Sequence, residues 1–95
     1  MVIAEISVTV LGKGPSIGPF VRVAVKELKK SGLKTISGPN CTSIEASNID
    51  DILNAVKAAH LAVVEAGAKR VVTHLKIDDR RDKPATLETK MKAVN

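Results

Sequence analysis

Two glutamates, each accompanied by short hydroxyl side chains, are the residues of this chain best suited to bind a small molecule. The set comprises Ser7, Thr9, Thr42, Ser43, Glu5 and Glu45. A carboxylate attracts a cation or an amine, and hydroxyl groups both donate and accept hydrogen bonds. The two carboxylates could also form a general-acid pair, but no nucleophile or base accompanies them. The pattern therefore predicts binding and no enzymatic activity.

A plainer interpretation of the two glutamates stays open at this level. Glu5 and Glu45 could instead form ion pairs on the sheet surface or across a subunit interface. The basic side chains available for this are Arg70, Lys76 and Lys34. The protein would then be a structural or regulatory oligomer without a small-molecule ligand.

The histidines and the cysteine lack the spacing of a metal site. His60 lies at the margin of an apolar helical pattern, which is typical of a packed histidine. His74 lies among polar strand residues, where a ligand role stays open, and Cys41 follows a turn with no base nearby. Zinc sites usually take paired ligands from short motifs, which are missing here. We expect no metal and no cofactor.

The segment Gly12-Lys13-Gly14 precedes an expected helix, as a phosphate-binding loop would. It lacks the residue spacing of the known nucleotide-binding glycine motifs. We therefore interpret it as a tight turn.

Composition narrows the class of protein. A chain of 95 residues suits one domain, covering residues 1–95. The net charge of +5 comes from dispersed basic residues, and Phe20 is the only aromatic residue. Bases would have no aromatic side chains to stack on, so we expect no nucleic-acid partner. The single cysteine and the absence of a long apolar run predict a cytoplasmic protein without a membrane span.

Alternating and helical patterns divide the chain into seven elements. Strands are expected at residues 2–10, 33–37, 41–47 and 70–78, because apolar residues alternate there or turn residues bound the segment. Three helices are expected, capped by Ser16, Asn48 and Thr86. Gly32 and Gly67 should end the first two.

The helices are expected to bury apolar stripes of different widths. The second has a wide stripe of Ile49, Ile52, Leu53, Val56, Ala59, Val63 and Val64. The third has a narrow stripe of Leu87, Met91 and Val94. A stripe this narrow suits a partner subunit or a small groove.

The element order predicts an α+β protein with a ferredoxin-like βαββαβ sandwich and an added C-terminal helix. Two interleaved βαβ units give a four-stranded antiparallel sheet with both main helices on one face. The other face would have no cover within the chain. A mixed face of this kind is a natural surface for a ligand or for a second subunit.

Three segments also resemble a known family, the small thiamine-binding proteins long catalogued as uncharacterised. These segments are AEISVTVLGKG, CTSIEAS and AVKAAHLAVVEAGAKRVVTHLKIDDRRD. The resemblance runs over essentially the whole chain. It implies a ferredoxin-like fold, homo-oligomers built as dimers of dimers, a site for thiamine or its aminopyrimidine half near subunit interfaces, and no enzymatic activity.

The same resemblance implies which residues bind the ligand. They are Ser7, Thr9 and the segment Thr42-Ser43-Ile44-Glu45. The IDDRRD run at residues 77–82 resembles a structural or interface signature. The chain departs from the family pattern at Asn40-Cys41-Thr42, where Met-Gly-Thr is usual, and at His74, where a threonine is usual. We expect the larger Cys41 and His74 side chains to narrow or reshape the pocket.

Overall fold

The computed structural model describes residues 1–95 and contains one sheet and three helices. In chain order the elements are β1 (Val2–Val10), α1 (Gly18–Lys30), β2 (Lys34–Ser37), β3 (Thr42–Ala46), α2 (Ile49–Glu65), β4 (Val71–Asp79) and α3 (Leu87–Val94). The four strands are ordered β2-β3-β1-β4, and every neighbouring pair is antiparallel. The predicted α+β class and ferredoxin-like order are confirmed.

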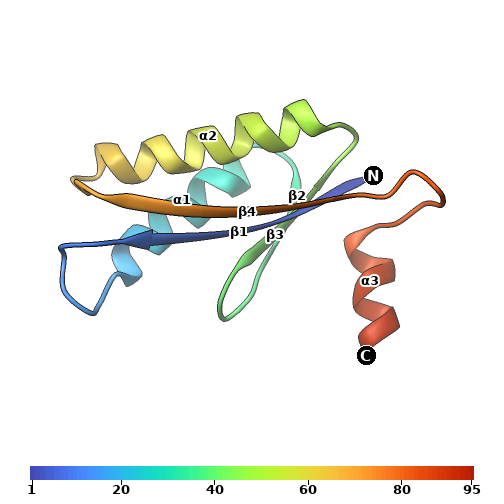
Figure 1. Ribbon diagram of the computed structural model, residues 1–95, viewed down its shortest axis with the longest axis horizontal. Helices are drawn as coiled ribbons and strands as arrows, with labels where there is room; N and C mark the ends of the chain where they lie inside the picture. Colours follow the sequence, from blue (N-terminus) through green and yellow to red (C-terminus); the bar gives the residue numbers. More distant parts are fainter.

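The helices α1 and α2 lie on the same face of the sheet (Figure 1). Alternate residues of β1 face them, and Ala4, Ile6 and Val10 are buried there with Ile44 of β3. Because side chains alternate along a strand, the residues between them face the other way. We call that second side of the sheet, which carries Glu5, the open face.

The strands differ in length, so the sheet is not equally wide along its course. β4 pairs with β1 over all nine residues of Val2–Val10, but β3 pairs only with the stretch from Val2 to Ile6. Beyond Ile6, β1 and β4 continue as a two-stranded ribbon.

The ends of α2 form as predicted. The side chain of Asn48 accepts a hydrogen bond of 2.9 Å from the backbone N–H of Asp51. Asp50 and Asp51 occupy the first turn, where negative charge is favourable. Gly67 follows the last turn with φ of +108°, which glycine adopts without strain.

The start of α1 differs from the prediction. The residue that precedes the helix is Ile17, and no side chain caps it, so Ser16 is not the cap. Pro19 lies in the first turn, where its fixed φ suits a helix and its missing N–H costs no hydrogen bond. The proline therefore sets the start of this helix.

The buried stripe of α2 is narrower than predicted. Ile49, Leu53 and Val64 are exposed, and Ala55 is buried instead. The buried set is Ile52, Ala55, Val56, Ala59 and Val63. These positions lie at three- and four-residue spacing on one side of the helix, and the three exposed residues lie beside that line.

The third helix, α3, corrects the prediction that the open face has no cover within the chain. Thr86 caps it as expected, since its hydroxyl accepts from Thr89 N–H and the Thr89 hydroxyl accepts from Thr86 N–H. Figure 1 shows α3 on the side of the sheet opposite α1 and α2. Leu87 and Ala85 form a small buried cluster with Ile3 there. No helix is long and apolar enough to cross a lipid bilayer.

A groove between the open face and the third helix

The open face is hollowed along β1 and β4, and the hollow passes beneath α3. The part beneath α3 has a volume of about 490 Å³ and is lined by Ile3, Ala4, Glu5, Ser43, Lys76, Asp78, Leu87, Lys90, Met91, Ala93 and Val94. The part beyond α3 has a volume of about 510 Å³ and is lined by Glu5, Ser7, Thr9, His74, Leu75 and Lys76. Glu5 and Lys76 line both parts, so we treat the two parts as one groove. Each part has the size of a small-molecule site.

Glu5 lies where the two parts of the groove meet. In the sheet it is opposite Ser43 on one side and Lys76 on the other. Its side chain is exposed, and the five ion pairs of the chain involve other residues. Glu5 therefore presents to the groove a carboxylate that forms no ion pair, suited to a cation or an amine.

The thiol of Cys41 is close to this carboxylate. Partial burial raises the pKa of Cys41 above its ordinary value, and the charge and hydrogen bonding of Glu5 raise it further. A raised pKa keeps the thiol protonated and unreactive. This agrees with the expectation from the sequence that no base near Cys41 activates its thiol.

Glu45 has a structural contact that the sequence did not reveal. Its Oε2 accepts a hydrogen bond of 2.8 Å from the backbone N–H of Leu87, the first residue of α3. This N–H has no partner within the helix, and a carboxylate there also complements the helix dipole. The Glu45 side chain is buried by the contact. It supports the wall of the groove and does not line it.

Thr42 lies on the helix-covered side of the sheet. It is opposite Ile6 in the strand pairing and is buried, as are Ile44 and Ala46 on the same side of β3. Of the ligand residues that the resemblance implies, Ser7 and Thr9 line the part beyond α3, and Ser43 lines the part beneath it. The structure does not bring Thr42 or Glu45 into the groove.

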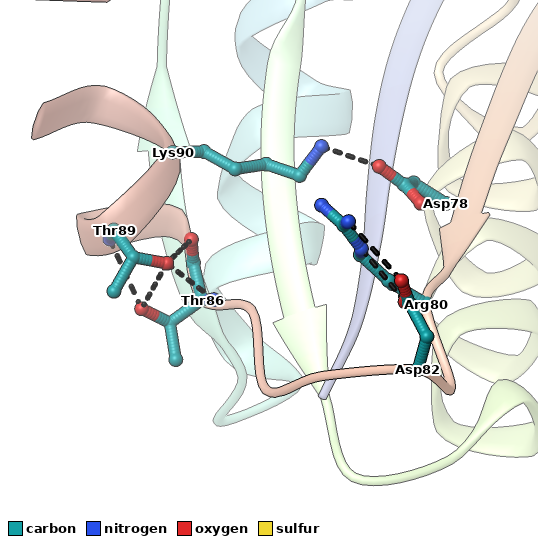
Figure 2. A network of polar contacts seen from close by, with 6 residues as sticks. All are labelled: Asp78, Arg80, Asp82, Thr86, Thr89 and Lys90. Carbon is teal, nitrogen blue, oxygen red and sulfur yellow. Dashed lines mark hydrogen bonds and ion pairs between the residues drawn. The ribbon is translucent and has the colours of Figure 1, made fainter. Parts of the chain in front are cut away.

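An ion pair fixes the middle of α3 to the sheet. Lys90 contacts Asp78 of β4, and this contact lowers the pKa of Asp78 below its ordinary value of 3.8. Figure 2 shows Lys90 reaching across to Asp78, with the Thr86–Thr89 cap at the start of the same helix. Together with Glu45, this pair holds α3 over the groove at two points.

The charged residues at the end of β4 and in the turn that follows it form ion pairs with one another. Arg80 pairs with Asp82 at 2.7 Å, as Figure 2 shows, and Arg81 pairs with Asp79 at 2.9 Å. These contacts lower the pKa of Asp82 and raise that of Arg81. The run thus shapes the turn that leads to α3.

The two histidines lie on opposite sides of the sheet. His60 of α2 is within 2.7 Å of the Thr73 hydroxyl through Nδ1, as suits a packed histidine. His74 is exposed in the groove. No three His, Cys, Asp or Glu side chains are grouped closely enough to hold a metal ion.

Sequence reasoning named Lys76 only as a possible ion-pair partner and Met91 only as part of an apolar stripe, and it did not single out Lys90, which also lines the groove. The strand pairing places Lys76 opposite Glu5, and the alternation of β4 is the signal that puts both on one face. The place of the α3 residues in the groove could not be predicted, because the local sequence pattern does not indicate which surface an eight-residue helix covers.

Comparison with known proteins shows the family of the chain. The model of a family described as "Thiamine-binding protein" matches residues 4–95. The chain belongs to the thiamine-binding protein family. The resemblance noted in the sequence is thereby confirmed at the level of the family.

Relatives of this thiamine-binding family member share its length and its fold. A UPF0045 protein of Methanothermobacter thermautotrophicus is 46% identical over 99% of this chain and 96% of its own length. The crystal structure of a hypothetical protein from Methanocaldococcus jannaschii has a TM-score of 0.90 at 43% identity, covering 98% of this chain and 94% of that one. A Thermotoga maritima protein, described as a candidate for thiamine biosynthesis or salvage, has a TM-score of 0.83 at 26% identity, covering 99% and 98%.

Proposed function

We propose that this protein binds thiamine or its hydroxymethylpyrimidine half in the groove, without catalysing a reaction. The observation that carries the proposal is the unpaired Glu5 carboxylate at the centre of a groove in a member of the thiamine-binding family. The relation to a Thermotoga maritima protein described in connection with thiamine biosynthesis or salvage supports the same ligand class.

The groove matches the chemistry of this ligand class in two respects. Thiamine carries a quaternary thiazolium ring, which an unpaired carboxylate such as Glu5 attracts. Its aminopyrimidine is flat, with polar edges that need a few donors and acceptors at fixed positions. Leu87, Met91 and Ile3 offer apolar contact beneath α3, and Ser43 offers a hydroxyl beside them.

The proposal includes self-association in the cytoplasm, as a dimer or a dimer of dimers. Its support is an apolar surface that the chain leaves exposed on α2, made of Ile49, Leu53, Leu61 and Val64. Burial of such residues between subunits would be favourable. Light scattering coupled to gel filtration should give a mass above the 10.0 kDa of one chain. A monomer at all concentrations would contradict this part of the proposal.

Titration calorimetry with thiamine and with hydroxymethylpyrimidine tests the binding directly. Glu5→Gln should weaken thiamine binding by up to about fivefold, the effect expected for an exposed charge pair. Glu65→Gln is the matched control, because Glu65 is an exposed, unpaired glutamate at the end of α2, outside the groove. Absence of heat and of a thermal shift with either ligand at millimolar concentration would refute the proposal. It would favour the alternative of a structural or regulatory oligomer.

A further inference from the structure

The part of the groove beyond α3 is lined on one side by basic side chains of β4. His74 and Lys76 are opposite Ser7 and Glu5 in the strand pairing, so both point to the open face. The pairing continues by one hydrogen bond of 3.0 Å from Leu11 N–H to the Arg70 carbonyl, which puts Arg70 on the same face. All three side chains are exposed, and none belongs to an ion pair of the chain.

The acidic residues of the groove do not neutralise this basic side. Asp78 is occupied by Lys90, and Glu45 is occupied by the N–H of Leu87. Only Glu5 has neither a cationic partner nor a backbone N–H partner in the chain, and it lies at the border with the part beneath α3. The groove therefore has an acidic point at its centre and a basic, hydroxyl-bearing region at its outer end.

Amines, imidazoles and hydroxyls are the side-chain groups that bind phosphate oxygens. The outer end offers Lys76, His74, Ser7 and Thr9 within one hollow. Side chains two residues apart on one strand face stand about 7 Å apart. The hydroxyethyl arm of thiamine with an attached phosphate can span that distance from Glu5 to Ser7.

We propose that the outer end of the groove binds a phosphate group, so that the preferred ligand is a phosphate ester of thiamine rather than thiamine itself. This inference rests on the proposed function, since it places the cationic ring of the same ligand at Glu5. Lys76 would be the main specificity-determining residue, because it adjoins both Glu5 and the hydroxyl-bearing end.

Calorimetric titrations with thiamine, thiamine monophosphate and inorganic phosphate at low ionic strength test the inference. The monophosphate should bind about fivefold more tightly than thiamine. This ratio should shrink as salt is added, because the phosphate contacts are exposed to solvent. Inorganic phosphate alone should bind much more weakly than the ester, since it lacks the ring that Glu5 holds.

Lys76→Gln should reduce the ratio of the two affinities toward one, and His74→Gln should reduce it by a smaller factor. Lys26→Gln is the matched control, because Lys26 is an exposed, unpaired lysine of α1 and lies on the other side of the sheet. It should leave the ratio unchanged. All three substitutions replace exposed side chains, so each variant should fold.

The outcomes separate the two proposals. If thiamine binds and its monophosphate binds no more tightly, the inference is wrong and the proposed function stands. The inference also fails if the monophosphate binds more tightly but Lys76→Gln leaves the ratio unchanged, or if inorganic phosphate binds as well as the ester. If neither thiamine compound binds, the inference fails, and the proposed function fails with it when hydroxymethylpyrimidine does not bind either.

Discussion

The helix-covered face and the open face of the sheet come from alternate residues of the same strands, yet different interactions hold them together. On the covered face, aliphatic side chains such as Ile44 and Ile6 pack against α1 and α2 over a wide area. On the open face, α3 is held by a small apolar cluster around Leu87, by the Glu45 hydrogen bond and by the Asp78–Lys90 pair. One face supplies stability, and the other keeps polar groups accessible.

The sharpest test of this difference compares two isoleucines on opposite faces. Ile44→Ala on the covered face should lower the free energy of unfolding by about 2–5 kcal/mol, because Ile44 is fully buried. Ile36→Ala on the half-buried open face should cost only about 1 kcal/mol. Urea denaturation of both variants measures the two values. Equal losses would show that the open face carries as much of the stability as the covered face.

Loss of the Glu45 carboxylate should act on α3 alone. Glu45→Ala leaves the buried N–H of Leu87 without an acceptor, at a cost of about 1–3 kcal/mol. Hydrogen exchange should then speed up at the amides of α3 and stay unchanged in α2. Glu45→Gln keeps an acceptor and should have a smaller effect. Unchanged exchange in α3 of the alanine variant would show that Glu45 does not hold the helix.

The smallest effect is expected at the Asp78–Lys90 pair, because exposed ion pairs contribute little to stability. The pKa of Asp78 is lower in the folded chain than its ordinary value of 3.8. A carboxylate of this kind stabilises the fold above its unfolded pKa, and the contribution is lost as pH falls through the lowered folded pKa. The contact of α3 with the sheet should therefore weaken in that acidic window.

Amide chemical shifts of α3, followed as pH is lowered from neutral, check this prediction. Asp78→Asn should diminish the acid-dependent shift change around Lys90, because the asparagine side chain does not titrate. Asp82→Asn is the control, since the pKa of Asp82 is also lowered but its partner is Arg80 in the preceding turn. An unaltered acid response in Asp78→Asn would assign the change to another group.

The covered face could be predicted from the sequence in detail, because buried residues recur at a regular spacing along each strand and helix. The alternation of β1 and the glycine after α2 identified elements, faces and an end correctly. Exposed apolar residues make this prediction less accurate, because they can share the same spacing. Ile49 and Leu53 fit the helical period of α2, and yet they lie outside the core. Periodicity alone cannot tell a buried stripe from the apolar residues beside it.

The candidate site was harder to predict because it depends on contacts between distant segments. The alternation of β3 already separates Thr42 from Ser43, and the structure places them on opposite faces. Glu45 bonds to a residue 42 positions later in the chain, and no local pattern reports such a contact. The role of α3 as a wall of the groove was hidden for the same reason.

The two-stranded ribbon formed by the ends of β1 and β4 has a mechanical consequence for the groove. Beneath α3 the groove floor belongs to the part of β1 that β3 and β4 flank on both sides, whereas Ser7 and Thr9 lie beyond the paired end of β3. Two-stranded ribbons twist more readily than wider sheets. The groove floor is thus flanked by strands on both sides at its inner end and is a more strongly twisted ribbon at its outer end, where the tail of the proposed ligand would lie.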